Sequence, residues 1–175
     1  MTPDRVLLVG MMGAGKTTVG TALAVRLGCG YVDNDALLQR TCGLPGAELL
    51  AQRGPEALTE AESQVLTMQL GIPGPLVAGI AGGVVLQEAD RDRIAGAGCH
   101  VVWLRATIAV LARRVGDGVD RPRLGDDLVA ALRVLAAERN PFYAQLADQV
   151  VDVDALPVGA VTRAIEAELT PDLQH

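Results

Sequence analysis

A glycine-rich segment near the N-terminus carries the residues best suited to chemistry. Gly10–Thr17 has the sequence GMMGAGKT, which fits GxxxxGK[ST], a pattern that binds the phosphates of a nucleoside triphosphate. Its glycines let backbone N–H groups turn toward an anion, while Lys16 reaches the β- and γ-phosphates. Lys16 is also the only lysine among 15 basic residues. The motif predicts Mg²⁺ binding by the hydroxyl of Thr17 and nucleotide binding by Gly13, Ala14, Gly15, Lys16, Thr17 and Thr18.

The residues that flank this segment indicate the elements that position it. An apolar run at Arg5–Val9 predicts a buried strand, and helical spacing follows over Gly15–Leu27. Strands that alternate with helices predict an α/β fold with a parallel sheet covered on both faces. Further strands are expected at residues 31–32, 76–80, 100–104 and 150–153, and further helices at 35–41, 43–52, 55–70, 88–97, 107–115, 128–140 (ended by Pro141) and 158–169.

Composition narrows the class of protein and its partners. The 175 residues, 50% of them hydrophobic, suit one domain over residues 1–175. A net charge of −6 disfavours nucleic acid as the main partner, because phosphate backbones need a basic surface. No apolar run is long enough to span a membrane, and the N-terminus lacks a signal-peptide layout. Three cysteines without CxxC spacing disfavour a zinc site, and we expect free thiols in the cytoplasm.

Several further positions suit a phosphoryl-transfer site, each with a structural alternative. Asp33 could hold Mg²⁺ and Asp35 could orient or deprotonate a substrate hydroxyl, but both could instead cap a helix. The backbone of Ala81–Gly83 could approach a ligand or only form a turn. Arg121, in a loop rich in Gly, Asp and Pro, could neutralise phosphate charge or lie in solvent. Arg139 could pair with a carboxylate or complement a helix dipole.

The order and spacing of these motifs resemble the shikimate kinase family over nearly the whole chain. The resemblance rests on GMMGAGKTTVG at residues 10–20, DND at 33–35, AGG at 81–83, RP at 121–122 and RNPFY at 139–143. It implies a P-loop kinase fold in three α/β/α layers, with a five-stranded parallel sheet in the order 2-3-1-4-5. A mobile lid at about 116–127 and acceptor-binding helices at about 35–70 are also implied.

The resemblance also implies an activity and a role for particular residues. It implies an ATP- and Mg²⁺-dependent kinase of aromatic amino acid biosynthesis, which transfers the γ-phosphoryl group to a ring hydroxyl of shikimate. Asp33 is expected to help place Mg²⁺, and Asp35 to bind the hydroxyls as a candidate base. Arg121 is expected to close over both substrates, Arg139 to grip the carboxylate and Arg114 to stack on adenine. The catalytic residues implied are Lys16, Asp35 and Arg121.

The acceptor half departs from the family pattern in several places. The family has an arginine for the substrate carboxylate at the position of Thr59, and phenylalanines at those of Leu50 and Leu58. Ala81 replaces a glycine, and alanine tolerates positive φ poorly, so we expect the backbone to run differently there. Arg123 is a candidate replacement for the missing charge. The substrate-binding residues expected are Asp35, Gly82, Gly83, Arg139 and the position of Thr59.

Two alternatives to a shikimate kinase follow from these departures. One is a kinase of the same fold for another small hydroxylated acceptor, such as a cyclitol, a sugar acid or a hydroxy acid. The other is a nucleotide-binding module without catalysis. The partners expected are ATP with Mg²⁺ and a small, anionic, hydroxylated metabolite, without nucleic acid or membrane, and we expect a monomer in the cytoplasm.

Overall fold

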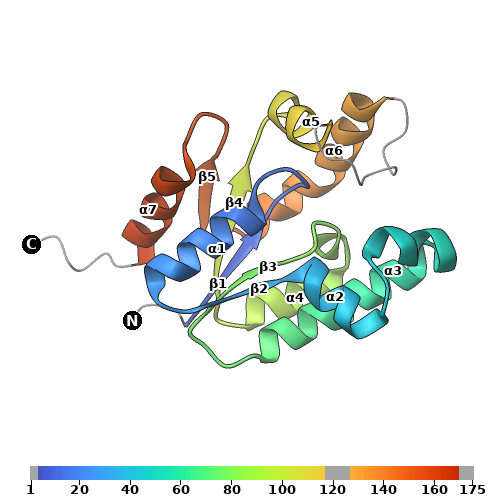
Figure 1. The fold of residues 1–175 in the computed structure, drawn as a ribbon, viewed down its shortest axis with the longest axis horizontal. Helices are drawn as coiled ribbons and strands as arrows, with labels where there is room; N and C mark the ends of the chain where they lie inside the picture. Colours follow the sequence, from blue (N-terminus) through green and yellow to red (C-terminus); the bar gives the residue numbers. More distant parts are fainter. Residues whose placement is uncertain (1–3, 117–126, 170–175) are drawn as a thin grey trace, which may run out of the picture.

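The protein is built on one five-stranded parallel sheet, described in a computed structural model over residues 4–116 and 127–169. The strand order is β2-β3-β1-β4-β5, as the family resemblance implied (Figure 1). In such a sheet, crossover helices link the parallel strands and cover both faces. The α/β fold predicted from the alternation of strands and helices is therefore confirmed. The strands are β1 (Arg5–Val9), β2 (Gly30–Asp33), β3 (Leu76–Gly79), β4 (His100–Arg105) and β5 (Gln149–Asp152).

The helices form a layer on each side of the sheet. Helices α1 and α7 pack together on one face, and α3, α4, α6 and a short 3₁₀ turn, η1, pack together on the other (Figure 1). Helix α2 packs on α3, and α5 on α6. The bounds are α1 (Lys16–Leu27), α2 (Asn34–Cys42), α3 (Gly46–Gly71), η1 (Val84–Leu86), α4 (Glu88–Gly96), α5 (Ile108–Gly116), α6 (Leu128–Leu146) and α7 (Val158–Leu169).

Strand register brings the candidate site residues to one edge of the sheet. Leu8 of β1 pairs with Gly79 of β3, and Gly79 also pairs with Asp33 of β2. The strands are parallel, so their carboxyl ends lie together, and the segment after Val9 starts beside Asp33. This edge is where ligands bind in open α/β sheets.

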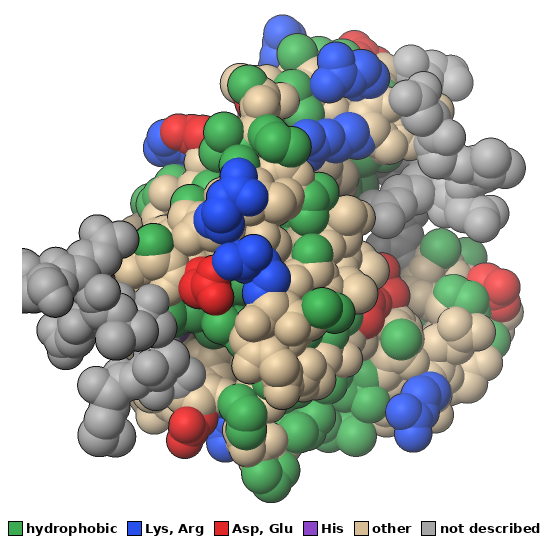
Figure 2. Space-filling model, turned by 60° about the vertical axis from the view of Figure 1, so that its left-hand side comes forward, with side chains coloured by type: hydrophobic (Ala, Val, Ile, Leu, Met, Phe, Trp, Pro, Cys, Tyr) green, Lys and Arg blue, Asp and Glu red, His purple; other side chains and the backbone are tan. Residues whose placement is uncertain are grey.

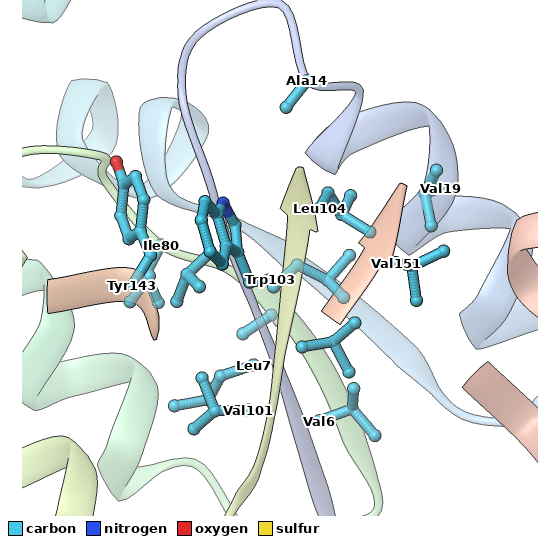
Figure 3. Packing of buried hydrophobic residues seen from close by; sticks show 14 of the residues in the cluster. Val6, Leu7, Ala14, Val19, Ile80, Val101, Trp103, Leu104, Tyr143 and Val151 are labelled. Carbon is cyan, nitrogen blue, oxygen red and sulfur yellow. The ribbon is translucent and has the colours of Figure 1, made fainter. Parts of the chain in front are cut away.

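Two separate groups of buried side chains hold the layers together. The main core joins the sheet to its covering helices and contains Leu7, Val102, Trp103 and Tyr143 (Figure 3). The rings of Trp103 and Tyr143 lie 5.8 Å apart at 42°, within the range of favourable aromatic pairs. A second core lies between α2 and α3 and consists of Leu38, Leu49, Ala61 and Val65, with Leu37, Cys42, Leu44 and Leu58 packed against it.

One helix boundary differs from the sequence-based prediction, and another agrees with it. Gly54, with φ 84° and ψ 175°, is non-helical and divides α3 into two helical segments, in agreement with the separate helices expected at 43–52 and 55–70. Helix α6 does not end at Pro141 but continues to Leu146, so that prediction was wrong. A proline inside a helix costs about 3 kcal/mol. The extra turn is stabilised because it buries Tyr143 completely against the main core.

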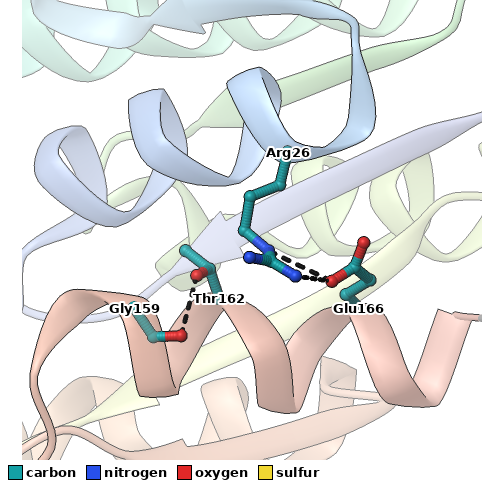
Figure 4. Close-up of polar contacts among 4 residues, drawn as sticks. All are labelled: Arg26, Gly159, Thr162 and Glu166. Carbon is teal, nitrogen blue, oxygen red and sulfur yellow. Dashed lines mark hydrogen bonds and ion pairs between the residues drawn. The ribbon is translucent and has the colours of Figure 1, made fainter.

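The exposed charged side chains form mixed groups of both signs on the face drawn in Figure 2. Basic side chains run down the middle of the face drawn in Figure 2, in places next to acidic ones. One ion pair joins Arg26 of α1 to Glu166 of α7, with Arg26 Nε 3.1 Å from the carboxylate (Figure 4). Another joins Arg105 to Asp152 at the ends of β4 and β5. No helix among the described residues is long and apolar enough to cross a membrane.

Candidate active site

The phosphate-binding loop turns sharply between β1 and α1 because of its glycines. Gly10, Gly13 and Gly15 all have positive φ, at 144°, 81° and 96°. Two of them also lie against neighbouring elements: a Cβ on Gly10 would lie 2.7 Å from the carbonyl oxygen of Leu104, and one on Gly13 would lie 2.9 Å from Val115. The glycine spacing recognised in the sequence therefore reflects both backbone conformation and close packing.

Lys16 and the first turn of α1 make the loop attractive to anions. The Lys16 ammonium donates to the carbonyl oxygens of Gly10 at 2.7 Å and Met11 at 3.3 Å, so its charge lies over the loop. Helix α1 begins at Lys16 after Gly15, which supplies no side-chain cap. The first N–H groups of α1 therefore lack a capping side chain, and with the helix dipole they favour a phosphate.

Thr17 and Asp33, the two residues that the sequence analysis assigned to a metal, are in direct contact. The Thr17 hydroxyl donates to Oδ2 of Asp33 at 2.8 Å. The other oxygen, Oδ1, accepts the backbone N–H groups of Asp35 at 2.9 Å and Ala36 at 3.2 Å, so Asp33 is also the N-cap of α2. The two readings of Asp33 are thus compatible: one oxygen caps a helix and the other faces the phosphate loop.

The chemistry of this pair suits Mg²⁺. A hydroxyl and a carboxylate are hard oxygen ligands, and Mg²⁺ in phosphate sites uses one or two protein ligands plus phosphate oxygens and water. Within residues 4–116 and 127–169, no group of three or more His, Cys, Asp or Glu side chains forms a self-contained metal cage. The donors present therefore fit an ion that arrives with a nucleotide.

Asp35 lies on the exposed first turn of α2, beyond Asp33. Its carboxylate Oδ1 accepts the side-chain amide of Asn34 at 3.2 Å. Asn34 is 5% exposed, and its own Oδ1 is buried with no hydrogen-bond partner among the described residues. Buried amide oxygens are normally paired, so this edge of α2 has unused hydrogen-bonding capacity beside Asp35.

Gly82, Gly83 and Arg139 come together on the other side of the loop. A Cβ on Gly82 would lie 3.2 Å from Nη1 of Arg139 and 3.3 Å from the carbonyl oxygen of Gly10. A Cβ on Gly83 would lie 3.4 Å from a carboxylate oxygen of Glu62. Of the predicted acceptor residues, Gly82 therefore lies beside the first residue of the phosphate loop. The turn after β3 supplies Gly82 and Gly83, α3 supplies Glu62 and α6 supplies Arg139.

Buried polar groups lie within this cluster. The Nε of Arg139 is buried with no hydrogen-bond partner in the described part of the chain. The hydroxyl of Tyr143 donates to the carbonyl oxygen of Gly82 at 2.8 Å. Burial raises the pKa of Tyr143 to about 12, with Arg139 opposing the shift and Glu62 adding to it. A half-buried guanidinium is suited to an anionic ligand, because it can pair with a carboxylate through two parallel hydrogen bonds.

The backbone at Ala81 does not show the expected change. None of the non-glycine residues described has positive φ, and Gly82 and Gly83 lie outside the left-handed region as well. Ala81 itself is buried at 7% exposure in the main core. The prediction of a different backbone path at Ala81 assumed a positive φ, which this turn does not have. Gly82 and Gly83 are glycines because neighbouring groups leave little room for a side chain there.

Thr59 lies on α3, where its side chain is bonded to its own helix. Its hydroxyl donates to the carbonyl oxygen of Pro55 at 3.0 Å, one turn earlier. It lines a groove of about 600 Å³ with residues of α3 and α4. Neither Asp35 nor Arg139 lines this groove. Thr59 therefore supplies no charge at the position where the family has an arginine. Its neighbour Leu58 packs against the second core.

Arg114 reaches the phosphate loop from α5. Its Nη1 donates to the carbonyl oxygens of Gly13 at 3.2 Å and Ala14 at 3.5 Å, and its Nη2 to that of Val153 at 3.1 Å. The residue expected to stack on adenine thus lies at the nucleotide loop. Arg121, Arg123 and most of the expected lid lie outside the described residues.

Sequence reasoning missed Tyr31. Its hydroxyl donates to Oδ2 of Asp33 at 3.1 Å, the same oxygen that Thr17 contacts. Burial, followed by the nearby Asp33 charge, raises the pKa of Tyr31 well above its usual value, so it remains a donor. The signal was available, because residues two apart in a strand point to the same face.

Comparisons with known proteins agree with this geometry. A family model described as shikimate kinase matches residues 12–170. A shikimate kinase of Halorhodospira halophila is 37% identical over 165 residues, covering 94% of this chain and 92% of that protein. One of Nitrobacter winogradskyi is 40% identical over 139 residues, covering 79% of this chain and 64% of its relative, so the chain spans somewhat less than two thirds of that protein.

Solved structures give the same result. A shikimate kinase from Acinetobacter baumannii, in complex with shikimate, superposes with a TM-score of 0.92 at 26% identity, covering 99% of this chain and 97% of that one. A gluconokinase from Sinorhizobium meliloti superposes with a TM-score of 0.68 at 21% identity over 97% of this chain and 93% of its own. That second likeness shows the fold alone.

The fold and the phosphate loop define a P-loop kinase, an ATP-dependent phosphotransferase that acts on an alcohol group. Within that class, the chain belongs to the shikimate kinase family, because the family model spans most of its length and relatives above 30% identity cover nearly all of it.

Proposed function

We propose that this protein transfers the γ-phosphoryl group of ATP to a hydroxyl of shikimate with the help of Mg²⁺. The observation that carries the proposal is the position of Gly82, which lies against both Gly10 of the phosphate loop and Arg139 of the acceptor cluster. A donor phosphate and an anionic acceptor bound on these two sides would be neighbours. Positioning of this kind supplies much of the rate of phosphoryl transfer.

The described side chains suit distinct parts of this reaction. Lys16 and the start of α1 would bind the phosphates, and Thr17 with Asp33 would hold Mg²⁺, which neutralises phosphate charge when bound. The unpaired Nε of Arg139 suits the acceptor carboxylate. Asp35 would orient the attacking hydroxyl and accept its proton as the new P–O bond forms and the bond from the γ-phosphorus to the β-phosphate oxygen breaks.

A coupled assay of ADP release tests the proposal. We expect shikimate-dependent turnover that needs both ATP and Mg²⁺, and its loss in Lys16→Ala and Asp35→Asn. Thr21→Ala is a matched control on α1, because Thr21 bonds only the helix backbone at Thr17. ATP binding without turnover at millimolar shikimate would contradict the proposal. If no other hydroxylated acceptor supported turnover either, the protein would be a nucleotide-binding module.

A second acceptor class is favoured by one observation, the side chain of Thr59. Its hydroxyl is bonded to Pro55 within α3, so it adds no cation to the single arginine described at the acceptor cluster. A less charged acceptor, such as a cyclitol, sugar acid or hydroxy acid, would need only Arg139 or none. Parallel assays with these compounds distinguish the two: a higher kcat/KM for one of them than for shikimate would identify the alternative.

We further infer a monomer in the cytoplasm. Cys29, Cys42 and Cys99 are all free thiols, which is the usual state in a reducing compartment. Size-exclusion chromatography with light scattering tests the oligomeric state; a mass near twice 18.2 kDa would contradict it.

A further inference from the structure

The carboxylate oxygen of Asp33 that faces the phosphate loop receives two side-chain hydroxyls, from Thr17 at 2.8 Å and Tyr31 at 3.1 Å. We propose that Tyr31 is a positioning residue that holds Asp33 in the orientation needed for Mg²⁺–nucleotide binding. The proposal rests on the proposed function only in taking Mg²⁺–ATP as the donor. It assigns a role to a residue outside the phosphate-loop and DND motifs.

The ring of Tyr31 occupies a slot formed by two glycines. A Cβ on Gly20 of α1 would overlap the ring, with Cδ2 only 2.8 Å away. A Cβ on Gly79 of β3 would lie 2.5 Å from the Tyr31 hydroxyl oxygen. Neither glycine has a positive φ, so neither is needed for its own backbone conformation. Glycine inside a helix or strand is destabilising. The space that the Tyr31 side chain occupies explains why glycine stands at both positions.

The slot lies directly beneath the start of α1. The Cβ position of Gly79 is also 3.7 Å from Cβ of Lys16. Lys16 and Gly20 are one helical turn apart and so share a face of α1. The Tyr31 hydroxyl therefore lies between the sheet and the base of the nucleotide-binding lysine, and it bonds Oδ2 of Asp33, whereas the α2 cap uses Oδ1.

The two oxygens of Asp33 are thus held by independent groups. Backbone N–H groups of α2 orient Oδ1, whereas Thr17 and Tyr31 share Oδ2. Thr17 is also expected to bind the metal, and a hydroxyl has only one proton to donate. Tyr31 keeps a donor on Oδ2 that does not depend on what Thr17 binds. Without it, Asp33 would have more freedom when Mg²⁺ and nucleotide arrive.

The variant Tyr31→Phe tests this by removing the hydroxyl and keeping the ring. We expect the Mg²⁺ concentration for half-maximal ATP binding, measured by titration calorimetry without acceptor, to rise by about three- to tenfold, the effect of one lost hydrogen bond. Nucleotide binding without Mg²⁺ should stay unchanged. In turnover, the Mg²⁺ requirement should rise while kcat at saturating Mg²⁺ changes little.

A second variant keeps the test independent of folding. In Gly79→Ala the new methyl group meets the Tyr31 hydroxyl, so we expect both stability and Mg²⁺ affinity to fall. In the double variant Tyr31→Phe/Gly79→Ala the methyl group meets only the ring, whose Cζ is 3.5 Å away, an ordinary contact. The double variant should therefore regain stability but still need the higher Mg²⁺ concentration that Tyr31→Phe needs for ATP binding.

Thr162→Val is the matched control, since it removes a buried hydroxyl that bonds only Gly159 within α7 (Figure 4). It should change the urea midpoint and leave Mg²⁺ dependence unaltered. The inference is overturned if Tyr31→Phe needs only the wild-type Mg²⁺ concentration for half-maximal ATP binding, or if the double variant returns to that wild-type concentration. Because binding is measured without acceptor, a failure of shikimate turnover would not affect this result.

Discussion

The guanidinium of Arg114 donates to the carbonyl oxygen of Gly13 at 3.2 Å and so joins α5 to the phosphate loop. Its other terminal nitrogen donates to Val153, just beyond β5. The side chain of Arg114 therefore connects the nucleotide loop to α5 and to the segment after β5, both far from the loop in the sequence. The loop's shape depends on this outside support as well as on its own glycines.

Replacing Arg114 should weaken nucleotide binding more than it destabilises the fold. In Arg114→Ala we expect the KM for ATP to rise by about tenfold, because three charge-assisted hydrogen bonds are lost, two to the loop and one to Val153 beyond β5. Arg113→Ala, at the exposed neighbouring position of α5, is the matched control. Equal KM values in the two variants would show that Arg114 does not support the loop.

The acceptor preference can be tested by adding the missing charge. Arg139 has a buried Nε without a partner among the described residues, and Thr59 is bonded to its own helix. A second cation near the acceptor carboxylate should lower the KM for shikimate in Thr59→Arg by about tenfold or more. Arg53→Ala, an exposed change on the same helix, serves as control. An unchanged KM would mean that position 59 does not face the bound acceptor.

The two tyrosines predict an unusual response to alkaline pH. Burial raises the pKa of both Tyr31 and Tyr143, the latter to about 12. The folded state therefore holds more protons than the unfolded state above about pH 10, and the free energy of unfolding falls as pH rises. Tyr143 alone should account for about 1–2 kcal/mol between pH 9 and about 11.

Tyrosinate absorbance measures this directly, since the chain has only 2 tyrosines. We expect the native protein to show almost no tyrosinate at about pH 10.5, whereas the protein in concentrated urea titrates near the ordinary value of about 10. Native titration at that ordinary value would contradict the burial of both hydroxyls. Urea midpoints at the same pH values check the loss of stability.

The ion pair between Arg26 and Glu166 should contribute little to stability. Both side chains are about one third exposed, at 37% and 33%. Exposed pairs are worth about 0.2–1 kcal/mol, so Arg26→Ala should lower the free energy of unfolding by less than about 1 kcal/mol. Thermal melts at low and high salt measure it, and a larger, salt-independent loss would mean that Arg26 acts through packing between α1 and α7.

Local sequence signals predicted the features that depend on a few neighbouring residues. The glycine spacing around Lys16 predicted the phosphate loop, and the alternation of strands and helices predicted a parallel sheet. The order of its strands came from the family resemblance alone. The continuation of α6 past Pro141 was not predictable locally, because the stabilising contact of Tyr143 is with a core from distant strands. The support of Gly13 by Arg114 spans 101 residues of sequence and has no local signal.

The candidate site shows the same division. The meeting of Thr17 with Asp33 followed from both lying at the carboxyl edge of the sheet. The slot around Tyr31 did not, because it depends on the absence of side chains at Gly20 and Gly79, on two different elements. At Ala81 the glycine pattern was interpreted as a conformational need, whereas the turn requires only room for Arg139 and Tyr143.

The second core has a consequence for how this enzyme could change over evolutionary time. Its members lie between α2 and α3 and are distinct from the residues of the main core. Substitutions at its four buried residues would change α2 and α3, the helices expected to bind the acceptor, without altering the residues of the main core. A lineage could thus drift toward new alcohols by small steps at these positions, and a directed-evolution library restricted to Leu38, Leu49, Ala61 and Val65 would sample the same route.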